Sequence, residues 1–146
     1  MVIGFILIYA LAGAQQSSVV SRSPAADEVY LWGQGLPDGR NFDYVVSEEA
    51  FDRPPQWLPE EGLPPLAIAR AIKIARSTIR ADHPELADLK PWTIELTQAS
   101  CRHKSSWFYV LSFYPVADPS AQTTITVVIL MDGTVAKARE KKASSK

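Results

Sequence analysis

The amino-acid sequence predicts a small α+β domain over residues 64–139, in which one amphipathic helix packs on an antiparallel meander of three or four strands. Apolar residues recur with helical spacing between Pro64 and about Asp82, and three apolar segments with strand-like patterns follow. Asp132 and Gly133 form the dipeptide of a two-residue hairpin turn, which separates the last two expected strands. A lead-in with an extended or hairpin conformation precedes the domain.

The helix has recognisable start and stop signals. Pro64 and Pro65 fit its first turn, where the missing N–H is not needed, and His83 before Pro84 marks its end. Placing residues 100° apart gives an apolar face made of Ile68, Ala71, Ile72, Ala75 and Ile79. The opposite face is basic and consists of Arg70, Lys73, Arg76 and Arg80. We expect this face to be solvated or covered by acidic residues, with an anion-binding or partner-binding face as the alternative.

The three apolar segments predict the strands of the meander. Trp92 to Gln98 alternates apolar and polar residues, as a half-buried strand does, whereas Trp107 to Tyr114 is apolar on both faces. Thr124 to Met131 is also largely apolar, and Thr134 to Arg139 is expected to return beside it as a short edge strand. The loops between the first three strands are expected at Ala99 to Ser106 and at Pro115 to Gln122.

The second face of the meander requires a cover, because one helix can cover only one face of a sheet. One alternative is the lead-in, which carries the aromatic residues Tyr30, Trp32 and Trp57. The other is a partner or ligand, and a protein partner would bind the outer face of the sheet through Phe108, Val110 and Tyr114. The lead-in is favoured, since monomers rarely leave a large apolar patch exposed.

The lead-in, residues 27–63, is acidic and rich in proline. Residues 27–61 contain nine acids and two arginines, whereas residues 62–146 contain twelve bases and seven acids, so the two parts are expected to lie against each other. Glu28 to Gln34 and Phe42 to Val46 suggest a hairpin, and Ser47 to Pro65 suggests an extended connection. The formal net charge of −1 argues against nucleic acid as the main partner.

The first residues predict export. Residues 1–14 are apolar throughout and end in Ala12-Gly13-Ala14, which fits a signal peptide cleaved near Ala14 and Gln15 and a secreted or periplasmic protein. The run is too short to span a bilayer comfortably, so no stable membrane insertion is expected after cleavage; a retained anchor or a mis-assigned start is the alternative. Residues 15–26 suggest a flexible linker and residues 140–146 a basic, disordered tail.

The sequence offers little catalytic chemistry. Cys101 is the only cysteine, so no intramolecular disulfide is possible. Cys101 and His103 form the only place in the sequence where a nucleophile and a general base lie close together. A thiol enzyme using this pair ranks last, because no third group or oxyanion hole accompanies it. His83 and His103 lack the spacing of metal ligands, so neither a metal nor another cofactor is expected.

Three segments resemble the PepSY domain and the wider cystatin-like architecture. They are Ala67 to Ile72 in the helix, Trp107 to Val110 in the central strand, and Val127 to Val135 around the Asp132-Gly133 turn. The resemblance, which covers about half of the chain, implies an exported, non-catalytic module that binds proteins and regulates or inhibits peptidases. A component of an envelope complex is a further expectation for such a module. The alternative is a carrier of a small apolar ligand held between helix and sheet.

Overall fold

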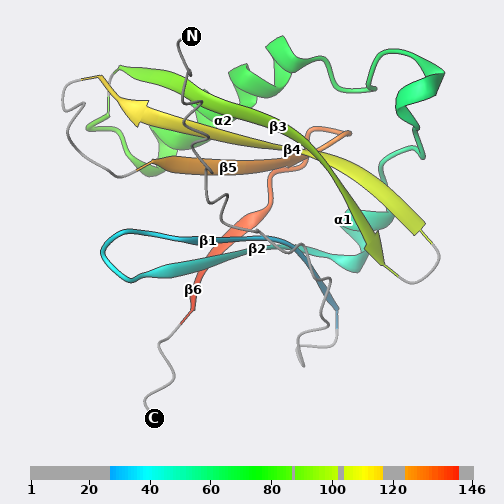
Figure 1. The fold of residues 1–146 in the computed structure, drawn as a ribbon, viewed down its shortest axis with the longest axis horizontal. Coiled ribbons are helices and arrows are strands. Elements are labelled where there is room, and N and C mark those ends of the chain that lie inside the picture. The colour runs from blue at the N-terminus through cyan, green and yellow to red at the C-terminus, as the bar shows by residue number, and fades with distance from the viewer. Residues whose placement is uncertain (1–26, 87, 102–103, 117–123, 142–146) are drawn as a thin grey trace, which may run out of the picture.

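Two three-stranded antiparallel sheets and one long helix form the fold, which is α+β (Figure 1). The computed structural model describes residues 27–86, 88–101, 104–116 and 124–141. One sheet has the strand order β1-β2-β6 and the other β3-β4-β5. The elements are β1 (Glu28–Gly35), β2 (Asn41–Ser47), α1 (Glu48–Asp52), η1 (Pro59–Glu61), α2 (Ile68–Asp82), β3 (Leu89–Cys101), β4 (Lys104–Pro115), β5 (Ile125–Leu130) and β6 (Lys137–Lys141).

The lead-in forms the hairpin β1-β2, which confirms that expectation. Its turn is closed by the amide of Leu36, which donates to the carbonyl of Arg40 at 2.7 Å. Gly39 has a φ of 87°, a conformation that favours glycine, so the Pro-Asp-Gly sequence suits this turn. The hairpin supplies two of the three strands of the β1-β2-β6 sheet.

The hairpin β3-β4 is longer than expected. The prediction of a loop from Ala99 to Ser106 is wrong, because β3 continues to Cys101 and β4 begins at Lys104. Ala99 pairs with Ser106, and the hydroxyls of Ser100 and Ser105 lie 3.3 Å apart on facing strands. Polar side chains are compatible with strand structure here because Ser100 is exposed, whereas the buried hydroxyl of Ser106 forms a hydrogen bond with a backbone carbonyl.

The last strand leaves the meander, which therefore has three strands. A turn forms at Asp132-Gly133, but it is not the expected two-residue turn. The amide of Gly133 donates to the carbonyl of Leu130 at 2.9 Å, so Met131 and Asp132 are the central residues, and Gly133, with a φ of 92°, follows them. The amide of Thr134 donates to Asp132 Oδ1 at 2.8 Å. However, β5 meets the returning chain in a single bridge, between Ile129 and Val135. The chain then crosses to the other sheet, where β6 pairs with β2 and extends beyond Arg139 (Figure 1). The expected four-stranded version of the meander is thus not formed.

Two apolar cores lie on the two faces of the β3-β4-β5 sheet. On one face, Ala71, Ala75 and Ile79 of α2 pack with Leu111, Phe113, Val127 and Ile129 of the sheet. On the other face, Val29, Leu31, Trp32 and Val46 of the hairpin pack with Phe108, Val110, Val128 and Leu130. The lead-in therefore covers the second face of the sheet, as the favoured alternative expected.

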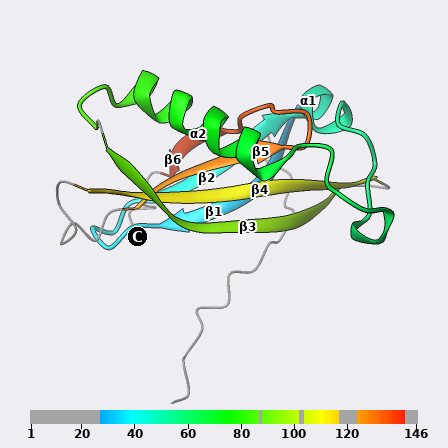
Figure 2. The ribbon, with the colours of Figure 1, turned by 90° about the horizontal axis from the view of Figure 1, so that it is seen from above.

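The helix α2 begins later than the proline pair suggested. Its first residue is Ile68 rather than Pro64, whereas its last residue, Asp82, matches the prediction. Ile68 is 49% exposed and is not a core residue. Leu66, just before the helix, is buried instead in the core between α2 and the β3-β4-β5 sheet. Figure 2 shows that α2 lies over the β5 side of the sheet, away from most of β3. The first residue of β3, Leu89, is still buried in the core beneath α2.

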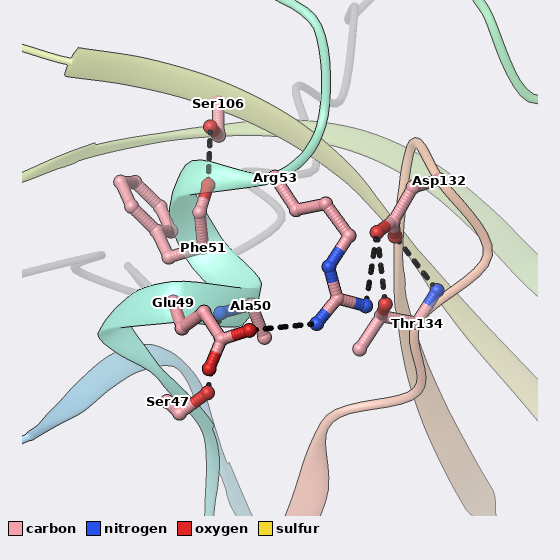
Figure 3. A network of polar contacts seen from close by, with 8 residues as sticks. All are labelled: Ser47, Glu49, Ala50, Phe51, Arg53, Ser106, Asp132 and Thr134. Atoms are coloured by element: carbon pink, nitrogen blue, oxygen red, sulfur yellow. Dashed lines mark hydrogen bonds and ion pairs between the residues drawn. The ribbon is translucent and has the colours of Figure 1, made fainter.

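The short helix α1 was not expected, since the sequence suggested an extended connection. Ser47 caps it: its Oγ accepts a hydrogen bond from the amide of Ala50 at 3.1 Å. Figure 3 shows Arg53 after this helix, with its guanidinium 3.9 Å from Glu49 and 3.8 Å from Asp132.

The helix α1 brings an aromatic anchor into the core between the sheets. Phe51 and Ala50 are both buried there. The hydroxyl of Ser106 on β4 donates to the carbonyl of Phe51 at 3.4 Å (Figure 3). Serine before two glutamates is a helix start signal, so the pattern from Ser47 to Glu49 could have predicted α1.

Candidate functional site

The outer edge of the β3-β4-β5 sheet carries an exposed apolar surface. Trp92, Ile94 and Leu96 of β3 are 68%, 38% and 39% exposed, although the sequence pattern suggested a half-buried strand. Because β3 pairs with no strand other than β4 among the described residues, it is an edge strand there. We call the segment from Trp92 to Gln98 the β3 edge.

The two central apolar side chains of the β3 edge lie on the face of the sheet that α2 covers elsewhere. Ile94 pairs with Leu111 and Leu96 with Tyr109, and residues directly opposite each other in a ladder share a face. Leu111 and Tyr109 are buried in the core beneath α2, whereas their neighbours on β3 are not covered. The exposure therefore results from the position of α2 and not from the direction of these side chains.

The direction of the backbone groups in this sheet follows from one hydrogen bond. Val128 of β5 accepts from the amide of Ala136 at 2.8 Å, so its backbone groups point away from β4. Val110 pairs with Val128, so its groups point in the opposite direction, toward β3, where its partner is Glu95. Glu95 and Val110 are therefore the residues that exchange hydrogen bonds across the β3-β4 ladder.

Alternation along the strand then places further backbone groups on the free side of β3. Ile94 and Leu96 flank Glu95, so their N–H and C=O groups face away from β4, as do those of Gln98. A register shift lies between Pro91 and Thr93, and the ladder is regular from Thr93 onward. The β3 edge thus combines exposed apolar side chains with backbone donors and acceptors.

The prediction of a partner surface on the opposite face of the sheet, the face covered by the β1-β2 hairpin, is wrong for two of its three residues. Phe108 and Val110 are 0% and 2% exposed, because the β1-β2 hairpin and α1 cover them. They are core residues and cannot contact a partner while the hairpin stays in place. Tyr114 is half-buried, and its ring lies 5.9 Å from that of Trp92 in an edge-to-face arrangement, so it adjoins the β3 edge.

The predicted basic face of α2 is a solvated surface. Its four residues, Arg70, Lys73, Arg76 and Arg80, are all exposed. Arg76 also reaches the sheet, where its Nη2 lies 3.5 Å from the carbonyl oxygen of Leu89. An acid of the lead-in pairs with the basic part of the chain elsewhere: Glu28 contacts Arg139 at 2.7 Å.

The candidate thiol chemistry lies at the border of the described residues. Cys101 is the last residue of β3, and the pair with His103 lies outside the described part of the chain. His83 Nδ1 is 3.4 Å from Glu85 Oε1, and both side chains are exposed. Among the described residues, no three His, Cys, Asp or Glu side chains are grouped to hold a metal ion.

Several predicted segments lie outside the described residues: the signal peptide at 1–14, the linker at 15–26 and residues 142–146 of the predicted tail. Within the described part of the chain, no helix has the length and apolar character needed to cross a membrane. Comparisons of the sequence and the fold with protein-family models, curated proteins and solved structures give no match. The β3 edge is therefore the candidate site on its geometry alone.

Proposed function

We propose that the chain is a non-catalytic protein-interaction module that binds an extended segment of a partner along the β3 edge. The observation that carries this proposal is the coincidence of two features at Ile94 and Leu96. Their side chains are exposed and apolar, and their backbone groups face away from β4. An added strand would pair with these backbone groups and cover these side chains.

The chemistry of the partner follows from the edge. A partner strand placed beside β3 would bury Ile94 and Leu96 under its own alternate side chains, so those should be apolar. Trp92 would add a large aromatic contact at the start of the regular ladder. Glu95, on the other face, favours a basic or polar residue at the position beside it.

The proposal also includes a location and a type of module, both of which rest on the sequence. The apolar run at residues 1–14 supports action in the secreted or periplasmic space, and the helix followed by a meander supports a PepSY-like or cystatin-like module. Such a module would regulate or inhibit a peptidase or belong to an envelope complex. A small apolar-ligand carrier is the second candidate, and a thiol enzyme that uses Cys101 ranks last.

Affinity capture from the secreted and envelope fractions of the source cells tests the proposal. The purified protein is compared with the double variant Ile94→Ser and Leu96→Ser, and with the matched control Leu63→Ser, a leucine that is 93% exposed and outside β3. We expect one partner to be retained by the wild type and the control and lost by the double variant. Equal capture by all three proteins would reject the β3 edge as the site.

A second pair of variants separates strand addition from side-chain contact. Gln98→Pro removes a backbone donor that faces away from β4, and edge strands tolerate proline at such positions. Gln98→Ser alters the same side chain and keeps the donor. With the captured partner, we expect at least tenfold weaker binding for Gln98→Pro and little change for Gln98→Ser. Equal affinities would mean that the partner contacts side chains without pairing with the strand.

A further inference from the structure

A cleft of about 700 Å³ lies where the two sheets meet the end of α2. Its lining comes from four parts of the fold: the β1-β2 hairpin, the last turn of α2, the start of β5, and the chain from Val135 into β6. The cleft does not involve the β3 edge. It also differs from the site expected for a small ligand, because the space between α2 and the sheet is filled by Ile79, Leu111 and Phe113.

The cleft exists because the last strand changes sheets. β5 meets the returning chain at the single bridge between Ile129 and Val135, after which β6 runs to β2 (Figure 1). Within the described part of the chain, the earlier residues of β5, from Ile125 to Val127, therefore pair with no strand but β4 and line the cleft. The crossover opens a space that a fourth strand of the meander would have filled.

The cleft has an apolar interior and one wall of uncharged polar groups. Ile79, Ile125, Val127 and Val135 belong to its apolar lining. The polar wall is a connected row: Tyr44 Oη is 3.2 Å from Gln34 Oε1 and 3.1 Å from the carbonyl oxygen of Thr126, and Gln34 Nε2 is 3.2 Å from Thr124 Oγ1.

The hydroxyl in this row is neutral at physiological pH, since the ordinary pKa of tyrosine is 10.0 and burial raises the pKa of Tyr44 further, to about 12. The oxygens of Tyr44 and Thr124 keep lone pairs for a further donor, and the Thr124 hydroxyl can donate. The wall can therefore form hydrogen bonds with a ligand without placing a charge beside it.

The charges at the rim of the cleft favour neither an anionic nor a cationic ligand. Its lining contains two cations, Arg40 and Lys137, and two acids, Asp82 and Glu140. It also contains His83, whose Nδ1 lies 3.4 Å from Glu85 Oε1. Arg40 is already engaged, since its guanidinium lies 2.8 Å from Asp38. Because the cations do not outnumber the acids, the rim provides no general attraction for an anionic or a cationic ligand.

We propose that this cleft binds an uncharged, mostly apolar small molecule that carries one hydroxyl or carbonyl oxygen. Its volume is within the roughly 300–1,000 Å³ typical of small-molecule sites, and its lining has the expected composition of an apolar interior with a few convergent polar groups. The apolar part of the ligand lies against Ile125 and Val127, and its oxygen reaches the row formed by Tyr44 and Thr124.

Fluorescence titration with Nile red, an uncharged apolar dye, tests the cleft directly. Ala138→Trp fills it from β6, at an exposed alanine of the lining, and Thr78→Phe fills it from α2. Ala69→Trp, at an exposed alanine of α2 outside the lining, is the matched control. We expect at least tenfold weaker dye binding for both filling variants and an unchanged affinity for the control. Using two filling variants on different elements keeps the test valid if one of them does not fold.

Competition then tests the chemistry of the ligand. Below their aggregation concentrations, 1-dodecanol is expected to displace the dye at lower concentration than dodecanoate, and Tyr44→Phe should reduce this advantage. Dye binding that survives both filling variants, or stronger displacement by the carboxylate, would overturn the proposal. Since none of these variants alters β3, their outcome is independent of partner binding at the β3 edge.

Discussion

Strands β3 and β4 are neighbours in one sheet, and both carry apolar side chains, yet their environments are opposite. From Phe108 to Leu111, β4 is buried on both faces, because α2 covers one face and the β1-β2 hairpin covers the other. From Trp92 to Leu96, β3 is exposed or half-exposed at every residue. The apolar pattern of a strand therefore does not decide its burial; the elements that reach it do.

This difference separates stability from recognition in the molecule. The residues of β4 hold the two layers together, whereas those of β3 are available for contact with another molecule. The following predictions compare the two strands and the layer that covers β4, and they are ordered from the largest expected effect to the smallest.

Truncation of Phe108 should have the largest effect. Phe108→Ala removes a fully buried ring from the core between the sheets, so the free energy of unfolding should fall by about 3–5 kcal/mol. Urea unfolding followed by tryptophan fluorescence measures this loss. A loss below about 1 kcal/mol would mean that the hairpin does not pack on β4 in solution.

High pH should weaken the contact between the hairpin and the β3-β4-β5 sheet. The folded pKa of Tyr44 is about 12 against an ordinary value of 10.0, so the stabilisation is complete below pH 10 and disappears as the pH rises through 12. The loss for this group should reach about 2 kcal/mol near pH 12, since each pKa unit corresponds to about 1.4 kcal/mol.

The measurement for Tyr44 compares two pH profiles. Urea unfolding of the wild type and of Tyr44→Phe is followed between pH 8 and 12, and the difference between the two slopes isolates this hydroxyl from the other tyrosines. We expect the wild type to lose more stability above pH 10 than the variant. Parallel profiles would show that Tyr44 is accessible to solvent in the folded protein.

The cap of α1 should matter less. Ser47→Ala removes the oxygen that accepts from the Ala50 amide, which should cost about 1 kcal/mol of stability. Ser77→Ala, at an exposed serine inside α2, is the matched control and should have little effect or be slightly stabilising. Equal effects of the two changes would indicate that the Ser47 cap does not stabilise α1 in solution.

The sequence predicts the local elements of this fold better than their partners. The hairpin β1-β2 and the end of α2 at Asp82 depend on nearby residues, and both were predicted correctly. The turn at Asp132-Gly133 was predicted at the right place but with the wrong central residues. The crossing of β6 to β2 depends on a pairing with a strand about 95 residues earlier, which no local pattern encodes.

The candidate site was harder to predict for the same reason. Phe108 and Val110 and their neighbours on β4 have the same apolar character on both faces, so the pattern could not show which face would be covered. The exposure of Ile94 and Leu96 depends on α2 lying over the β5 side of the sheet (Figure 2). One signal was available: the first strand of a meander has one neighbour within the meander, so it lies at an edge unless another segment pairs with it.

The smallest effect should come from β3 and would complete the comparison. Leu96→Thr replaces a 39% exposed side chain with a β-branched polar one, which strands accommodate well, so stability should change by about 0.5 kcal/mol or less. Urea unfolding under the conditions used for Phe108→Ala gives the direct contrast between neighbouring strands. A loss near 2 kcal/mol would show that another part of the chain or a second copy covers Leu96 in solution. The β3 edge would then be an occupied surface, and partner binding would have to displace what covers it.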